Sequence, residues 1–94
     1  MRIRWTNSAL ADLEEIHERQ AIHWPSRGAA FDARLSAIEK RLLQFPHSAP
    51  EVARRPGVRV VAFIDFPFRL FYSVNAETIE VHAIRHTSRR PIFE

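Results

Sequence analysis

The order of polar and apolar patterns along this 94-residue chain predicts an α+β fold, with elements in the order β-α-α-β-β-β. Helical periodicity occupies the first half, whereas residues 58–64, 67–74 and 78–84 alternate or run apolar as strands do. Because the two helices follow one another closely, we expect a helical hairpin packed on one face of a small sheet, mainly antiparallel. The chain has no internal repeat and no linker-like stretch, so residues 1–94 are expected to form a single domain.

The first strand and the first helix are predicted from the N-terminal residues. Residues 2–5 alternate between polar and apolar side chains, which is typical of a short strand. Thr6 or Asn7 then offers a side-chain oxygen that can cap a helix. The helix is expected to run to about Trp24, because Pro25 cannot continue it.

The second helix carries the clearest periodic signal in the chain. Ser26 is placed to cap it, and a loop at residues 46–56 with three prolines is predicted to follow it. Arg54 and Arg55 stand near the far end of that loop. The apolar residues of the helix recur at steps of four and three: Phe31, Leu35, Ile38, Leu42 and Phe45.

The second half of the chain predicts three strands. Residues 58–64 are apolar on both faces apart from Arg59, as expected of a central strand covered on one side. Residues 67–74 and 78–84 flank Asn75-Ala76-Glu77, and Asn tolerates the positive φ of a tight turn better than most residues. The last two strands are therefore predicted to form a β-hairpin.

Arg69 is the leading candidate for a functional side chain. It interrupts an apolar strand, where a guanidinium must reach solvent, a carboxylate or a ligand, because burial of an unpaired charge is costly. Arg69 shares a face either with His82 and His86 or with Arg85, since a slip of one residue exchanges the two sets. Arg59, on the preceding strand, is expected to lie beside it. An arginine that merely faces solvent is the alternative interpretation.

Two further side chains are candidates for acid–base chemistry. An imidazole can donate or accept a proton near neutral pH, so His86 is a candidate general acid, although a histidine that hydrogen-bonds at a strand end fits equally well. Glu51, the only carboxylate in the long loop, is a candidate base or a partner for Arg54 or Arg55. His82 and His86 are too far apart along one strand to bind zinc without a third ligand, so no metal and no cofactor is expected.

Arginine dominates the charge of the chain. The net charge is +3, and Lys40 is the only lysine among 14 basic residues, a bias that suits a polyanionic or acidic partner. Arg85, Arg89 and Arg90 cluster with His86 and are candidates for phosphate binding, as is Arg59, while a solvated tail is the alternative interpretation of the cluster. The chain has no glycine-rich phosphate loop and no acidic metal cluster, which argues against a nucleotide- or metal-dependent enzyme.

The targeting signals that direct proteins to or across a membrane are missing from the sequence. No apolar stretch is long enough to span a bilayer, and the charged N-terminus lacks the apolar segment of a signal peptide. The chain also contains no cysteine, which is compatible with a reducing compartment. We therefore expect a cytoplasmic protein without membrane contact.

Five short patterns stand in a fixed order along the chain. They are WT-x-x-A-x-x-D-L at Trp5 to Leu13, a helical hairpin ending in Phe45-Pro46, Gly57-x-Arg59, Pro67-Phe-Arg-x-x-Tyr72-x-Val74 and Ile84-Arg-His86-x-x-Arg89-Arg-Pro91. Together they resemble the RelE/ParE family of type II toxins over nearly the whole chain. The resemblance implies a compact sheet with two helices packed on it, in a cytoplasmic bacterial toxin that a co-encoded antitoxin wraps and silences.

The family divides by target, and the resemblance implies catalytic residues for the RelE-like branch. RelE-like members cut ribosome-bound mRNA without a metal, for which Arg69 would grip the scissile phosphate, His86 would act as acid and Glu51 as base. ParE-like members poison DNA gyrase. The chain lacks the lysine-rich middle of RelE-type enzymes and has Phe93 where several end in tyrosine. We favour a ParE-like toxin, with the ribosome-dependent endoribonuclease as the alternative and a small basic nucleic-acid-binding module third.

Overall fold

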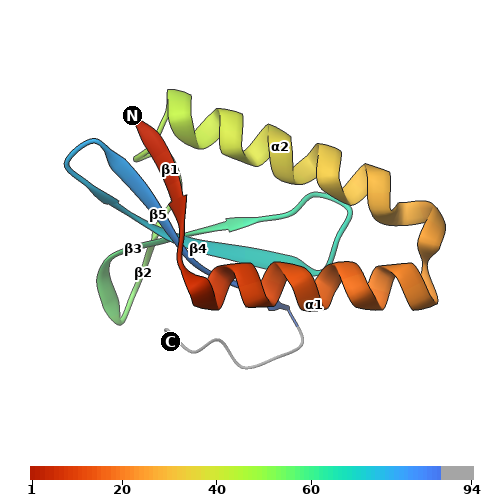
Figure 1. Ribbon diagram of the computed structural model, residues 1–94. Coiled ribbons are helices and arrows are strands. Elements are labelled where there is room, and N and C mark those ends of the chain that lie inside the picture. The colour runs from red at the N-terminus through yellow and green to blue at the C-terminus, as the bar shows by residue number, and fades with distance from the viewer. Residues whose placement is uncertain (88–94) are drawn as a thin grey trace.

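The computed structural model describes residues 1–87, which form a five-stranded sheet with two long helices on one face (Figure 1). The elements are β1 (Arg2–Trp5), α1 (Asn7–His23), a 3-10 turn η1 (Pro25–Arg27), α2 (Gly28–Gln44), β2 (Glu51–Val52), β3 (Arg55–Ala62), β4 (Phe68–Asn75) and β5 (Thr78–His86). The strand order is β1-β5-β4-β3-β2, with β1 parallel to β5 and the other neighbours antiparallel. The predicted α+β fold is confirmed, and β2 is an addition to the predicted elements.

Helix α1 begins and ends where the sequence predicts. The Oγ1 atom of Thr6 accepts a hydrogen bond from the backbone N–H of Ala9 at 3.1 Å, so Thr6 is the N-cap. The N–H of Trp24 donates to the carbonyl of Gln20 and closes the helix before Pro25. No helix within residues 1–87 has both the length and the apolar character that a bilayer crossing requires.

Helix α2 begins later than predicted. Pro25 opens a tight 3-10 turn, and α2 then starts at Gly28 with Arg27 as its N-cap and no side-chain hydrogen bond there. The prediction that Ser26 caps α2 is therefore wrong, because the proline-led turn places Ser26 inside η1. The predicted apolar stripe is buried at Phe31, Leu35, Ile38 and Leu42, whereas Phe45 follows the helix and is 55% exposed.

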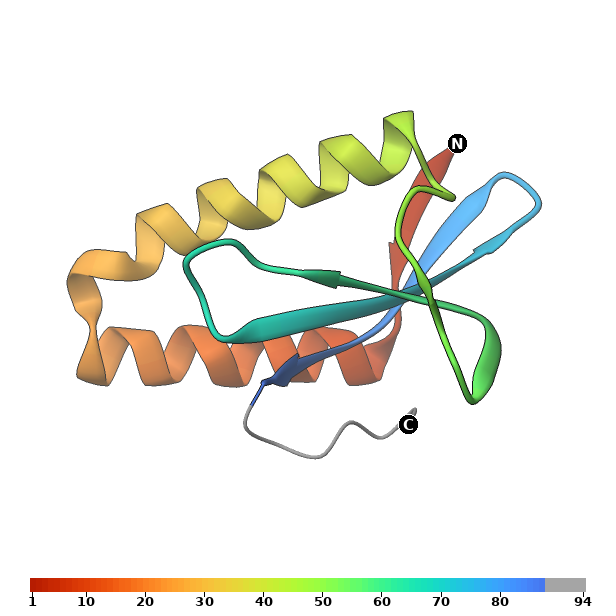
Figure 2. The same ribbon diagram turned by 180° about the vertical axis from the view of Figure 1, so that it is seen from behind.

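The helices pack chiefly on the sheet and on the turn between β3 and β4. The ring of Phe31 stacks on Phe63, with 5.1 Å between centroids, and meets Phe66 and Phe68 edge-on at 5.4 and 5.7 Å. Seen from either side, the helices join at one end and diverge toward the other (Figures 1 and 2). The residues of this helix-covered core are Ala9, Ile16, Phe31, Leu35, Ile38, Leu42, Ala49, Phe63, Leu70, Tyr72, Ile79, Val81 and Ile84.

The strands form the predicted hairpin with three differences in detail. The connection is the Ala76-Glu77 pair, and Ala76 rather than Asn75 has the positive φ, 49°. The pairing register shifts between Phe71 and Tyr72, so that His82 is the extra residue of β5 in a β-bulge. Strand β3 is not central as predicted, because it lies between β4 and the two-residue β2, and none of its residues is buried.

The sheet face away from the helices, which we call the open face, carries a smaller apolar cluster. Phe71 and Ala83 are fully shielded there together with Val52 of β2, and Val58 and Val60 pack beside them. Alternation along β4 places Phe71 on this face and its neighbours Leu70 and Tyr72 on the helix-covered one. The short β2 therefore has a packing role that its length does not reveal.

Candidate functional site

The hairpin register places Arg69 of β4 directly opposite Arg85 of β5. The residues next to them in the strands, Leu70 and Ile84, are in the helix-covered core. Arg69 and Arg85 therefore belong to the open face, where Phe71 and Ala83 form the next pair. Of the two predicted sets, the one that unites Arg69 with Arg85 is confirmed. Like charges directly opposite each other on a sheet are destabilising, so each guanidinium needs an anionic neighbour.

Asp12 of α1 supplies that neighbour for Arg85. Its Oδ1 lies 3.1 Å from Nη1 of Arg85, and its Oδ2 accepts the backbone N–H of Ile84 at 3.1 Å. Strand β1 ends at Trp5, which pairs with Val81, so the part of β5 after Val81 has no neighbouring strand on that side. The carboxylate of Asp12 accepts a backbone N–H at this open edge in place of a strand. The sequence did not single out Asp12 as a site residue. The sequence did offer a signal for it. Asp12 belongs to the same short pattern as Trp5, and it follows buried Ala9 by three residues, so both lie on one face of the helix.

His86 lies on the other face of the sheet from Arg69. It pairs with Phe68, whose ring meets the imidazole edge-on with 5.5 Å between centroids. The predicted set in which Arg69 and His86 share a face is therefore wrong, because one strand position separates His86 from the partner of Arg69. Arg89 and Arg90, the other two predicted phosphate-binding residues of the cluster, lie outside the described residues.

Arg59 holds the loop before β2 and does not lie beside Arg69. Its Nη1 donates to the carbonyls of His47 and Ala49 at 3.0 and 2.7 Å, and its Nη2 lies 3.5 Å from Oε1 of Glu51. The expected neighbour relation is wrong, because Arg59 pairs with Tyr72, whose side chain is on the helix-covered face. Glu51 is thus bound by Arg59, a partner that the sequence did not predict for it.

Tyr72 holds the same loop from inside the core. Its side chain is fully buried, and its hydroxyl donates to the carbonyl of Pro46 at 2.8 Å. Burial raises the pKa of the Tyr72 phenol above its ordinary value of 10.0, and nearby Arg59 and Arg41 offset part of the rise. Tyr72 and Arg59 together fix the segment that carries Glu51.

A groove of ≈ 1100 Å³ runs between α2 and β3, and we call it the α2–β3 groove. Its apolar floor includes Ile38, Leu42 and Val61. Its charged lining consists of Arg34, Arg41, Glu51, Arg54 and Arg69. Arg69 and Glu51 therefore line one groove, whereas His86 lines a different cavity, between α1 and the ends of β4 and β5.

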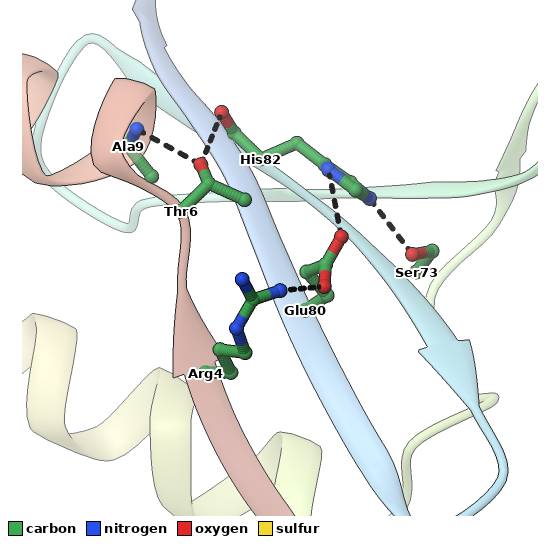
Figure 3. A network of polar contacts seen from close by, with 6 residues as sticks. All are labelled: Arg4, Thr6, Ala9, Ser73, Glu80 and His82. Carbon is green, nitrogen blue, oxygen red and sulfur yellow. Dashed lines mark hydrogen bonds and ion pairs between the residues drawn. The ribbon is translucent and has the colours of Figure 1, made fainter.

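A polar network that no sequence pattern indicated surrounds the bulge at His82 (Figure 3). Nε2 of His82 lies 2.7 Å from Oγ of Ser73, and its Nδ1 lies 3.8 Å from Oε1 of Glu80, which also pairs with Arg4. The composition is that of a nucleophile triad, but 3.8 Å exceeds hydrogen-bond distance and Ser73 stands in the middle of a paired strand. We interpret the network as structural: its side chains connect β1 and β4 to β5 beside the bulge.

No metal-binding cluster occurs within residues 1–87, where no three side chains of the types His, Cys, Asp and Glu gather closely enough. The charged and titratable side chains that line the groove and the cavity carry guanidinium, carboxylate and imidazole groups. Two arginines face one way from the hairpin, and one of them also lines the α2–β3 groove. Guanidinium groups in this arrangement suit phosphates or carboxylates of a partner.

Comparison with known proteins extends the resemblance seen in the sequence. No curated protein matches the chain. A solved chain described as "Chromosomal ParDE TA system from P. aeruginosa" is 25% identical, with a TM-score of 0.77 over 92% of this chain and 95% of that one. A family model described as the ParE toxin of the type II toxin–antitoxin system parDE matches residues 3–91. The chain therefore belongs to the ParE toxin family of type II toxin–antitoxin systems.

Proposed function

We propose that this toxin inhibits growth by poisoning DNA gyrase, without hydrolysing nucleic acid. The observation that supports this target most is the separation of the three side chains that a ribonuclease would need. Arg69 and Glu51 line the α2–β3 groove, whereas His86 lies against Phe68 on the other face of the sheet. A general acid must reach the same phosphodiester that the arginine binds, within hydrogen-bond distance of the leaving oxygen.

The partner that neutralises the toxin is proposed to be an acidic antitoxin segment that becomes ordered in the α2–β3 groove. Four arginines line the groove, and its one carboxylate, Glu51, is bound by Arg59. The floor is apolar, so an amphipathic segment with alternating acidic and apolar side chains would complement it. The similar structure is described as a toxin–antitoxin system, which supports a protein partner of this kind.

The target is tested by inducing the toxin without its antitoxin. We expect DNA to be trapped in gyrase cleavage complexes, detected as protein-linked double-strand breaks, while transcripts stay intact on ribosomes. Glu51→Gln and His86→Gln should remain toxic, because neither change alters a step of gyrase poisoning in this proposal. Transcripts cut at ribosomes, together with loss of toxicity in His86→Gln, would contradict it.

A ribosome-dependent endoribonuclease is the second candidate, and Arg69 favours it. Arg69 lines the α2–β3 groove, where its guanidinium can bind a phosphodiester and stabilise charge in the transition state, whereas Asp12 of α1 holds the guanidinium of Arg85. In that case Arg69→Ala should slow cleavage by roughly a hundredfold or more, with the fold intact. His86→Gln should slow it by a factor on the order of 10²–10⁴, provided that His86 acts as the general acid.

A further inference from the structure

A separate cavity of ≈ 490 Å³ lies between α1 and the ends of β4 and β5, and we call it the α1–β5 cavity. It shares no lining residue with the α2–β3 groove. Small-molecule sites typically measure about 300–1,000 Å³ and combine apolar walls with a few polar groups. Most of the accessible surface of this cavity is apolar, and its apolar lining includes Ile16, Trp24, Phe66, Phe68 and Ile84. Six charged side chains also line it: Asp12, Glu15, Arg19, Arg27, Asp65 and Arg85.

Two residues that line the cavity each have a buried polar atom without a hydrogen-bond partner. Within residues 1–87, two buried side-chain polar atoms lack a hydrogen-bond partner, Oε1 of Gln20 and Nε of Arg85, and both residues line this cavity. Gln20 is only 6% exposed, so its carbonyl oxygen is shielded from bulk solvent. Buried polar atoms in native proteins nearly always have partners. An acceptor and a donor left unpaired in one cavity therefore indicate a ligand from outside the chain.

The positions of the two atoms define the shape of that ligand. Gln20 stands eight residues after Asp12, which holds Arg85, and eight residues span about 12 Å along a helix. The acceptor and the donor thus come from separate parts of the lining, Gln20 from the later part of α1 and Arg85 from the end of β5. Another part of the lining is held in place by Arg27, which stacks on the ring of Phe66 at 4.6 Å and donates to the carbonyl of Asp65 at 3.0 Å.

We infer that the α1–β5 cavity binds a small planar heteroaromatic ligand with a hydrogen-bond donor at one edge and an acceptor at the other. The donor pairs with Oε1 of Gln20, and the acceptor pairs with Nε of Arg85. Rings of the ligand pack on Phe66 and Phe68, which line the cavity. The terminal amide torsion of glutamine is broad, so Oε1 can turn toward an incoming donor. This inference does not depend on the target of the toxin.

The test uses the full chain labelled with ¹⁵N and 5-methoxyindole, which has an N–H at one edge and an ether oxygen at the other. We expect saturable amide shifts confined to residues 12–24, 65–68 and 84–86. The N-methylated probe lacks the donor and 5-ethylindole lacks the acceptor. Each should bind roughly 2- to 10-fold more weakly, the usual effect of one hydrogen bond.

Gln20→Met removes the acceptor at nearly constant side-chain length, so 5-methoxyindole and its N-methylated form should then bind about equally. Gln44→Met is the matched control at an exposed position near the end of α2, and it should keep the wild-type preference. The inference fails if the lining amides show no saturable shifts, or if wild-type protein binds all three probes alike. The wild-type comparison stands even if Gln20→Met does not fold.

Discussion

Removal of the Asp12 carboxylate should lower the free energy of unfolding more than removal of an exposed carboxylate does. Asp12 holds the Arg85 guanidinium and the N–H of Ile84, and the side chains of Asp12 and Arg85 are 13% and 23% exposed. Asp12→Ala leaves both donors unpaired in a mostly buried position. Loss of one partner of a buried ion pair costs about 3–5 kcal/mol. Because the pair is partly hydrated, we expect the free energy of unfolding to fall by about 2–4 kcal/mol.

The assay is urea unfolding followed by tryptophan fluorescence. With a slope of about 1–3 kcal/mol/M, the midpoint should fall by roughly 0.7–4 M. Asp12→Asn keeps an acceptor for Ile84 and should lose about half as much. Asp32→Asn is the matched control, because Asp32 pairs with His17 at the surface with 60% of its side chain exposed, and it should change stability by less than about 0.5 kcal/mol. An Asp12→Ala protein as stable as that control would refute the reasoning.

Three further predictions concern the loop and the groove. Tyr72 has a raised pKa in the fold, so its contribution to stability is complete below the ordinary value of 10.0 and is lost as the pH rises through the folded value. Unfolding measured at pH 8 and at pH 11 should show a smaller alkaline loss in Tyr72→Phe than in the wild type. Arg59→Met should lower the free energy of unfolding by about 1–3 kcal/mol, because two backbone carbonyls and Glu51 lose their donor. The amides of loop residues 47–51 should then exchange hydrogen faster, and unchanged exchange would count against this prediction. Antitoxin affinity, measured by calorimetry, should weaken as salt rises, and Arg34→Gln with Arg41→Gln should flatten that dependence, whereas no binding at low salt would exclude the proposed partner.

The sequence by itself determined the elements whose signals are local. The steps of four and three from Phe31 to Leu42 fixed the buried stripe of α2, because side chains at that spacing lie on one face of a helix. Thr6 and Pro25 bounded α1 through a side-chain cap and a missing N–H, which act within a few residues. The hairpin followed from two alternating runs around a short turn. The order of these elements was enough for the α+β fold.

Only the tertiary structure decided how the candidate site residues are grouped. The set that contains Arg69 depended on the hairpin register and on a bulge at His82, and a shift of one residue moves a side chain to the other face. Arg59 looked like a neighbour of Arg69, yet the β3–β4 pairing turns it toward the loop carbonyls. Asp12 meets Arg85 across 73 residues of sequence. Such pairings are set by the packing of distant segments, so no local pattern encodes them.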